Sequence, residues 1–547
     1  MRLRAAFILR VDAVLSCLGR FFGPEGTRGA IMVIFALSLV PMTMTFGTAM
    51  DFAHAAKSKV MLRKAIDTAA LGALAQSDPS EDQVMATANA FLEANLDGLA
   101  AEITSLNIHS EPGKVRIDAS AEVPTTLMSA FGIDSLTIEA ESEAIFGTMP
   151  VEIALVIDNT GSVYEGGVAD DLKAAIKDFL TELETQFATG SPGANQPRVA
   201  LIPYTSFVNV KGPGFKWDWI DTNGYSSIHR AGLDLATGET LFDLFDQIPN
   251  AEWMGCVMAR PGDLEWEDTA PDIGDGDSLF VPLFSPDEPD HWIETGAYAR
   301  RANNYLSDDY FTSSTVPNYL DLYDALTTEQ VYNDIIRSTD KYNGTPFAYP
   351  SAAGTSINGP NNGCDSVPVM PLTTDVSSIR NAVDQLSYQV GGGTNTAEGM
   401  AWGYRVLSPG EPFSEGNDFS PATQKIMIVF TDGINNASKH EESKRKDTVK
   451  STYTAYGYRR EARLGFDSLS DYDNHIDDRM LDVCDKAKED GILVHTIVYN
   501  VDQSTQNLFK ECSSDEDLHF HHTTSGSQLE TAFMTASKYT GALRLAK

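Results

Sequence analysis

The chain has 547 residues, 42% of them hydrophobic, and its 40 Lys and Arg against 77 Asp and Glu give a formal charge of −37. This length predicts roughly two to four domains, and the hydrophobic content excludes a disordered chain. The acidity argues against nucleic acid as a partner, because nucleic-acid-binding proteins present basic surfaces, and it suits a soluble, self-repelling surface.

The first predicted element is an uncharged run over residues 29–50, GAIMVIFALSLVPMTMTFGTAM. As a helix it is long enough to cross a bilayer core of about 30 Å, and membrane helices tolerate a kink at a residue such as Pro41. A cleaved signal peptide is the alternative, but its apolar core is usually about 7–15 residues. We therefore expect an uncleaved transmembrane helix. Arginines in residues 1–28 favour a cytoplasmic N-terminus by the positive-inside rule.

Residues 51–148 are predicted to form a small α+β stalk. The Ala-rich stretch 51–76 continues the helix, and 80–96 predicts a second helix with a Ser-x-x-Gln capping pattern. Three alternating runs follow, ITSLNIHSE, KVRIDASAEV and LTIEAESEAIF, and they predict three antiparallel strands with a turn at Pro112-Gly113. A pilin-like module is the alternative interpretation of this helix and sheet.

The run GAIMVIFALSLVPMTMTFGTAMDFAHAAKSKVMLRKAIDTAALGALA resembles the N-terminal segment of TadG-like proteins of the tight-adherence (Flp) pilus machinery. The RGA start, the ALSLVP core, Asp51 and the DTAALGAL end carry this resemblance. It implies a single-pass protein of the bacterial inner membrane, with its bulk in the periplasm and a role in pilus assembly. Prepilins of this system carry a Glu five residues after a cleavage Gly. Here Ile34 stands at that position after Gly29, so we do not predict a pilus subunit.

The most informative stretch is VEIALVIDNTGSV over residues 151–163. Its apolar part predicts a buried strand that ends at Asp158. The loop after it presents Asp158, Thr160 and Ser162 as D-x-T-x-S, and a helix is expected from about Asp170. A strand, a polar loop and a helix in this order place ligands at the carboxyl end of a parallel sheet.

Two later segments repeat this pattern. GGGTNTAEGMAWGYRVL, residues 391–407, predicts a glycine-rich loop with Thr394 and then a helix, and KIMIVFTDGINN, residues 425–436, predicts a buried strand ending at Thr431-Asp432-Gly433. Residues 491–500, GILVHTIVYN, predict a further strand. This alternation predicts an α/β fold with a doubly wound, Rossmann-like parallel sheet.

The oxygen-bearing side chains of these loops suit a hard divalent cation. Mg²⁺ prefers octahedral geometry and keeps waters, so a site with only two carboxylates leaves a coordination position open. A carboxylate of a partner protein can fill that position. The alternative is that the polar groups only cap helices.

In this order the segments resemble the metal-ion-dependent adhesion site of the von Willebrand factor A (vWA) family, whose motif is D-x-S-x-S, a distant Thr, and a distant Asp within T-D-G. The resemblance implies a vWA domain over 149–547 that binds Mg²⁺ or Mn²⁺ and, through the metal, a protein partner. One departure is Thr160 in place of the first Ser, which keeps the hydroxyl. The implied metal ligands are Asp158, Thr160, Ser162, Thr394 and Asp432.

The segment of about 211–371 is predicted to be an insertion within this domain, because it is too long for an ordinary loop. The insertion either frames the metal face or is a cap that stabilises the fold.

Four cysteines follow the apolar run, and Cys17 precedes it. No C-x-x-C spacing occurs, which argues against a zinc site, and an even number on one side of a membrane suits two disulfides. Sequence proximity favours Cys256–Cys364 and Cys484–Cys512 among the three possible pairings.

Two further stretches carry weaker sequence signals for metal binding. The acidic loop from Asp272 to Asp277 lacks the spacing of an EF-hand. The HFHH stretch, residues 519–522, predicts a surface strand rather than a metal site.

These patterns predict a membrane-anchored binding protein of pilus assembly or surface adhesion. One alternative is a structural scaffold spanning the periplasm without metal-dependent binding. A metal-dependent hydrolase is the other, but the chain lacks a G-x-S-x-G elbow, an HExxH motif and a Walker A loop. We expect the protein not to be an enzyme.

Overall fold

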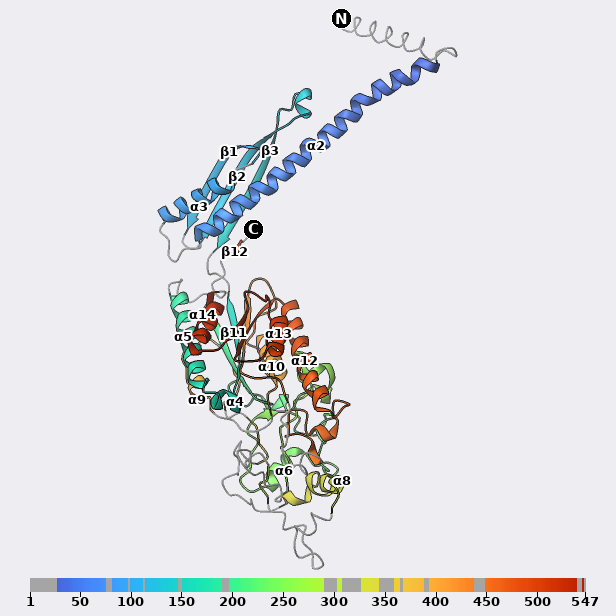
Figure 1. Cartoon of the computed structure of the whole chain (residues 1–547), viewed down its shortest axis with the longest axis vertical. Coiled ribbons are helices and arrows are strands. Elements are labelled where there is room, and N and C mark those ends of the chain that lie inside the picture. Colours follow the sequence, from blue (N-terminus) through green and yellow to red (C-terminus); the bar gives the residue numbers. More distant parts are fainter. Residues whose placement is uncertain are drawn as a thin grey trace, which may run out of the picture. The chain divides into compact units, whose positions relative to one another are not determined.

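The structure is a computed structural model that describes residues 27–74, 81–96, 99–111, 114–145, 150–188, 196–289, 303–306, 326–343, 359–364, 367–387, 393–436, 448–538 and 544–545. The predicted cytoplasmic segment 1–28 lies outside these residues, apart from its last two. The chain divides into two compact units, shown in Figure 1. The first comprises Met1–Gly147 with Ala542–Lys547, and the second comprises Thr148–Gly541.

The first unit is a sheet covered by helices. Its strands lie in the order β1-β2-β3-β12, all antiparallel to their neighbours, and the long helix α2 packs against β2 and β3 (Figure 1). The three predicted antiparallel strands are therefore present. The elements are α2 (Thr27–Leu74), α3 (Glu81–Asn95), β1 (Glu102–Glu111), β2 (Lys114–Pro124), the 3-10 turn η1 (Met128–Phe131), β3 (Ser135–Ile145) and β12 (Arg544–Leu545).

Period-2 alternation forms the core of this unit. Every second residue of β2 from Val115 to Val123 is buried, because successive side chains of a strand point to opposite faces. These residues share one apolar cluster with Leu62 and Ile66 of α2. The last strand, β12, was not predicted, since the closing residues were assigned to the second domain.

Asp51 fixes the loop after β2 to α2. Its buried carboxylate accepts hydrogen bonds from the backbone N–H groups of Thr126, Leu127 and Met128 at 3.0, 3.0 and 2.8 Å. These bonds lower the pKa of Asp51. The acidic residue that follows the apolar run therefore has a structural role within the first unit.

Residues 29–50, predicted to be a transmembrane helix, form the first half of α2. Within the described part of the chain, no helix combines the length and apolar character needed to cross a membrane. The structure therefore does not support that prediction.

The second unit contains a six-stranded sheet in the order β11-β10-β9-β4-β5-β8. All neighbours are parallel except β8, which is antiparallel to β5. The predicted α/β fold with a parallel-type sheet is confirmed, with one antiparallel edge strand added. The strands are β4 (Val151–Asp158), β5 (Arg198–Tyr204), β8 (Met370–Thr373), β9 (Gln424–Thr431), β10 (Ile492–Tyr499) and β11 (Phe520–Thr523).

Helices cover both faces of this sheet, as expected for a doubly wound fold. Ile153, Leu155 and Ile157 of β4 pack in one apolar cluster with α5, α9 and α14. Ala154 and Val156 pack in the other, with α10, α12 and α13 (Figure 1). The helices of this unit are α4 (Gly161–Glu165), α5 (Ala169–Ala188), α6 (Leu241–Gln247), α8 (Thr328–Gln330), α9 (Val376–Gln385), α10 (Thr396–Leu407), α12 (Leu469–Glu489), α13 (Gln503–Cys512) and α14 (Gly526–Lys538).

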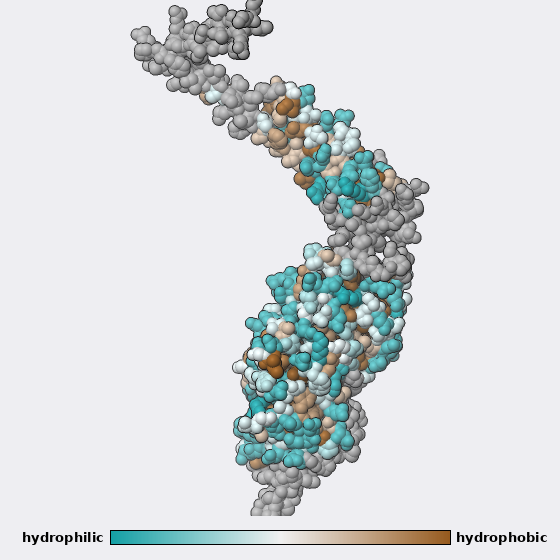
Figure 2. Space-filling view, turned by 180° about the vertical axis from the view of Figure 1, so that it is seen from behind, coloured by the Kyte–Doolittle hydropathy of each residue, from teal (hydrophilic) through white to brown (hydrophobic). Residues whose placement is uncertain are grey.

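The described part of the predicted insertion consists of short elements, including β7 (Cys256–Val257), which pairs with β6 (Val208–Asn209) just before the insertion. Its apolar side chains belong to the same cluster as α10 and α12, so it shares their core. Both predicted disulfides are confirmed, with Cα–Cα distances of 5.5 Å for Cys256–Cys364 and 5.2 Å for Cys484–Cys512. The described surface of this unit seen in Figure 2 is mostly hydrophilic, with small apolar patches.

Candidate metal site

The site begins at Asp158, the last residue of β4. Its side chain is 1% exposed. Its Oδ1 accepts hydrogen bonds from the Thr160 N–H at 2.9 Å and from the Thr160 hydroxyl at 2.7 Å. Its Oδ2 accepts one from the Thr431 hydroxyl at 2.7 Å. Both carboxylate oxygens are therefore held in place by the loop after β4 and by the end of β9.

Ser162 connects this loop to Asp432. The Ser162 Oγ lies 3.0 Å from the Thr160 Oγ1 and donates a 2.7 Å hydrogen bond to the Asp432 Oδ1. The sheet explains the meeting, because β4 and β9 are parallel neighbours with Ile157 opposite Phe430. The carboxyl ends of adjacent parallel strands share one edge of the sheet.

Thr394 lies on a third segment, just before α10, and is buried. Its N–H donates to the Asn436 carbonyl at 3.1 Å, and the Asn436 N–H donates to the Thr394 carbonyl at 3.0 Å. These bonds hold the Thr394 segment beside the loop that follows β9. Among the described residues, no hydrogen bond joins the Thr394 side chain to the other four predicted ligands. The structure thus brings four of the five side chains into one hydrogen-bonded cluster and holds the backbone of the fifth against the same loop.

Among the described residues, neither carboxylate of this cluster is in a salt bridge with a basic side chain. Burial raises the pKa of Asp158, and its hydrogen bonds from Thr160 and Thr431 offset part of that rise. Burial and then the negative charge of Asp158 raise the pKa of Asp432 to about 7. A cation at this position would therefore favour the ionised form of both groups.

The donor set fits a hard divalent cation. It comprises two carboxylates and hydroxyl oxygens, which are the ligand types that Mg²⁺ and Mn²⁺ prefer. A hydroxyl that donates its proton to a carboxylate still has oxygen lone pairs for a metal. In the described part of the chain, no group of three or more His, Cys, Asp or Glu is placed to hold a metal. This site has two carboxylates, so its hydroxyls must supply the remaining protein ligands.

Sequence reasoning did not assign a role to Thr431 or Thr205. Thr431 follows Phe430, whose register opposite Ile157 places it next to Asp158. Alignment of the two predicted strands would have found it. Thr205 follows β5, and nothing in its sequence context marks it.

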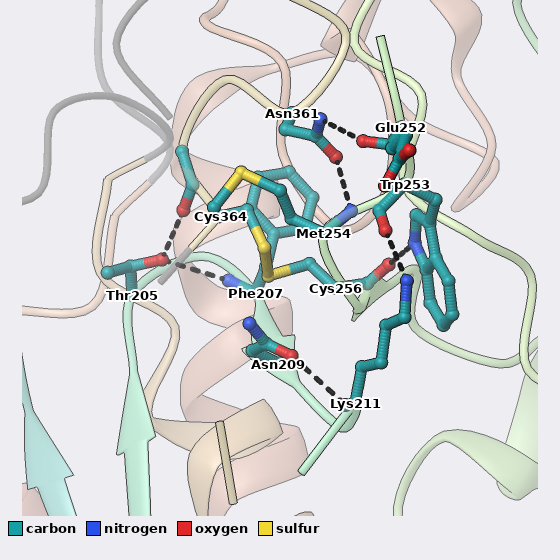
Figure 3. The surroundings of a disulfide bond; sticks show 11 residues. Thr205, Phe207, Asn209, Lys211, Glu252, Trp253, Met254, Cys256, Asn361 and Cys364 are labelled. Atoms are coloured by element: carbon teal, nitrogen blue, oxygen red, sulfur yellow. Dashed lines mark hydrogen bonds between the residues drawn. A yellow bond between two sulfur atoms is a disulfide. The ribbon is translucent and has the colours of Figure 1, made fainter. Parts of the chain in front are cut away.

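Thr205 connects the Thr394 segment to the Cys256–Cys364 disulfide. Its carbonyl accepts a 3.0 Å hydrogen bond from the Asn395 N–H, and its hydroxyl donates a 2.9 Å bond to the Gly363 carbonyl. Figure 3 shows Thr205 beside the disulfide and the Asn361 contacts around it. The insertion therefore supports the loop that carries Thr394.

The two weaker metal candidates have structural contacts instead. Asp272 accepts a hydrogen bond from the Gly274 N–H at 2.8 Å, and Asp277 accepts one from the Ser227 N–H at 2.6 Å. His519 and His521 lie on the side of the sheet where His495 of β10 is buried, with ring centroids 4.5 and 6.2 Å from that of His495. The strand is therefore half-buried at His521, and His519, which precedes it, is buried.

No family model matches the chain, and no curated protein sequence matches it either. Among solved structures, it is similar to the pilus adhesin SpaC from Lactobacillus rhamnosus GG, with a TM-score of 0.31 and 11% identity over 81% of this chain and 35% of that chain. It is similar to the vWF domain of the type V pili tip protein Mfa5 from Porphyromonas gingivalis, with a TM-score of 0.30 and 11% identity over 72% of this chain and 95% of that chain.

A third similar structure is proximal thread matrix protein 1 from the mussel byssus, with a zinc-occupied MIDAS motif. Its TM-score is 0.20 and its identity 12%, over 74% of this chain and 100% of that chain. The chain spans about a third of the length of SpaC. At these scores and identities the similarities carry no argument about the function of this chain.

Proposed function

We propose that the second unit is a metal-dependent binding module of the vWA type. In this proposal, Asp158, Thr160, Ser162, Thr394 and Asp432 hold Mg²⁺ or Mn²⁺ at the carboxyl edge of the sheet. The metal would supply a Lewis-acid position for a carboxylate of a protein partner. The observation that carries the proposal is the hydrogen-bonded cluster of Asp158, Thr160, Ser162 and Asp432, built from two distant segments around two carboxylates, of which Asp158 is buried and Asp432 half-buried.

The surface beside the cluster supports a binding role. Ile434 lies two residues after Asp432, and its side chain is 52% exposed. An apolar side chain next to a carboxylate-binding position offers a partner a contact that excludes water from the polar one. The partner we expect is therefore a protein whose Asp or Glu stands next to an apolar residue.

A binding role accounts for the site better than hydrolysis does. A metal-dependent hydrolase needs a base positioned to activate water. Here Asp158 accepts three hydrogen bonds from Thr160 and Thr431, and Asp432 accepts one from Ser162. These contacts fix the carboxylates as ligand groups, so we propose that the protein is not an enzyme.

The wider role that we propose is in Flp pilus assembly or surface adhesion, by the resemblance of residues 29–75 to TadG-like proteins. Location in the bacterial inner membrane, with a cytoplasmic N-terminus and a periplasmic bulk, stays a prediction from sequence. Alkaline extraction of cell envelopes tests it, because an anchored protein stays in the membrane pellet and a peripheral one is released.

The test of the binding proposal is a pull-down by the full chain from native envelope extracts, with and without a chelator. We expect at least one bound protein to be lost on chelation and also with Asp158→Ala. Asp384→Ala, which removes an exposed carboxylate of the same unit, is the matched control and should keep the partner. An unchanged set of bound proteins in all cases contradicts the proposal.

The same variant separates the binding role from the scaffold alternative. A structural scaffold needs the fold and not the metal, so Asp158→Ala would leave pilus assembly intact if the protein folds and accumulates normally. The binding proposal expects assembly or adhesion to fail in that variant.

A further inference from the structure

The second unit contains a pocket outside the proposed metal site. Its volume is about 590 Å³, which lies within the range of small-molecule sites. Residues of the insertion and of the segment 448–466 line it together. Five of the lining side chains are basic, namely Arg230, Arg337, Lys450, Arg460 and Arg463. Such a concentration of positive charge stands out in a chain whose formal charge is −37.

Three of these basic groups have carboxylate partners. Arg337 lies 2.6 Å from Asp234, Arg460 pairs with Glu329, and Lys450 pairs with Asp467. The pairs involve exposed carboxylates, which are solvated and compete weakly for a cation. They fix the orientation of the basic groups more than they neutralise the pocket.

Arg230 and Arg463 are held in a different way. Arg230 donates to the carbonyls of residues 235, 236 and 239 at 2.9, 2.9 and 3.0 Å. Arg463 donates to the carbonyls of Ala455 and Ala259. A guanidinium carries five N–H donors, so these bonds orient both groups and leave donors over. Within the described residues, neither guanidinium is in a salt bridge.

Glu461 adds an unusual acidic group to the wall. Both its carboxyl oxygens are buried and have no hydrogen-bond partner among the described residues. They lie against Gly232 and Gly457, where a Cβ would overlap them, and both glycines have a φ near +80°. Burial raises the pKa of Glu461 to about 7. The backbone is thus shaped to admit this carboxyl, which offsets less of the positive charge than an exposed Glu would.

We propose that this pocket binds a small polyanion whose clustered anionic oxygens are held by Arg230 and Arg463. Guanidinium groups match carboxylate and phosphate oxygens because their planar donors bind two oxygens at once. The net negative charge of the chain repels anions elsewhere, while the basic lining of this pocket attracts a polyanion. The proposal does not depend on the metal site.

Two ligand classes carry this chemistry, phosphate esters and polycarboxylates. Inorganic pyrophosphate and citrate are the matching probes. Isothermal titration calorimetry on the full chain, stripped of metal by a chelating resin and kept at constant ionic strength, keeps the metal site out of the measurement. We expect saturable binding of at least one probe, and the stronger one indicates the class.

A double variant that carries the substitutions Arg230→Gln and Arg463→Gln tests the pocket. We expect it to weaken probe binding at least about tenfold, because the charge-assisted bonds are lost. Lys450→Gln, a milder change at the rim, should weaken it about two- to fivefold without endangering the fold. Arg380→Gln is the control, since Arg380 pairs with Glu184 away from the pocket, and it should bind as the wild type does.

Thermal unfolding with and without probe gives a second measurement. A ligand of the native state raises the Tm, and the shift should be present in wild type and Arg380→Gln and reduced in Lys450→Gln. Absence of binding by both probes at about 1 mM, a range in which even weak sites are seen, overturns the proposal. Equal probe affinity of the wild type, of Lys450→Gln and of the double variant overturns it as well.

Discussion

Ser162 and Asp432 lie 270 positions apart in the chain, and the Ser162 hydroxyl donates a 2.7 Å hydrogen bond to the Asp432 carboxylate. The bond exists because β4 and β9 are neighbours in the sheet and each ends at the same edge. Because this bond joins the two residues, a change in one of them should alter the metal-binding properties of the other.

Replacing Ser162 with Ala should weaken Mn²⁺ binding to the full chain by about tenfold or more, because an oxygen ligand is removed and a bond to Asp432 is lost. Thr160→Ser keeps the hydroxyl and is the matched control, with affinity close to wild type. Calorimetric titration of Mn²⁺ measures both. Equal affinities for wild type and Ser162→Ala would remove Ser162 from the ligand set.

Asp432→Asn should abolish metal binding and yet stabilise the metal-free protein. The substitution removes a half-buried negative charge next to Asp158 while its amide oxygen can still accept from Ser162. In a chelator at about pH 8, we expect its Tm to exceed that of wild type by a few degrees, as a gain of about 1 kcal/mol would produce. Differential scanning calorimetry measures it. A lower Tm would mean that the carboxylates do not repel each other in the folded state.

The histidine cluster predicts a loss of stability in mild acid. Burial, and then the neighbouring His519 and His521, lower the pKa of His495 to about 3. The unfolded chain, with a His pKa of about 6.5, therefore binds more protons between these values, so stability falls as the pH drops below about 6.5. For one His the loss between about pH 7.5 and about pH 5 is on the order of 2 kcal/mol.

His495→Leu should remove most of this loss, and His109→Gln, which changes an exposed His of the first unit, should not. Urea unfolding followed by tryptophan fluorescence is the measurement, because all six Trp belong to the second unit. Parallel pH dependence of wild type and His495→Leu would contradict the prediction.

The two disulfides should differ in their effect on metal binding. Cys256–Cys364 adjoins Gly363, whose carbonyl accepts from Thr205, and Thr205 in turn holds the Thr394 segment. The double Ser variant at Cys256 and Cys364 should therefore lower Mn²⁺ affinity several-fold. The same change at Cys484 and Cys512 is the control. Both variants should lose about 2–5 kcal/mol of stability, and only the first should bind metal more weakly.

Equal metal affinity of the two disulfide variants would show that the Thr394 loop keeps its position without the insertion. Thr205→Val tests the same connection locally, because it removes the hydroxyl and leaves both disulfides in place. It should lower Mn²⁺ affinity in the same direction as loss of Cys256–Cys364.

The parts of the fold that sequence reasoning predicted are those with a strong local signal. The strand ending at Asp158 and the one ending at Thr431 are continuous apolar runs, and a parallel sheet brings their ends together. The alternation from Val115 to Val123 likewise identifies β2 and its buried face. The cysteine pairs followed from proximity in the chain.

Other features depend on tertiary contacts that no local pattern carries. Tyr456 and Tyr458 belong to a stretch of the sequence rich in charged residues, yet both are buried, and their hydroxyls donate to Glu265 and Glu288. β12 consists of two residues, Arg544 and Leu545, which is too short for any periodicity. Whether the Thr394 hydroxyl joins the cluster also depends on side-chain geometry that the motif does not specify.

The short strand β12 has a consequence for the order in which the protein is made. It pairs with Ile145 and Ala144 of β3, although the whole of the second unit is synthesised between the two strands. The sheet of the first unit can therefore gain its fourth strand only after translation has passed the second unit. Folding from the N-terminus leaves Ala144 and Ile145 without this pairing for that interval, so a chaperone that binds exposed strand ends can act on them before β12 is made.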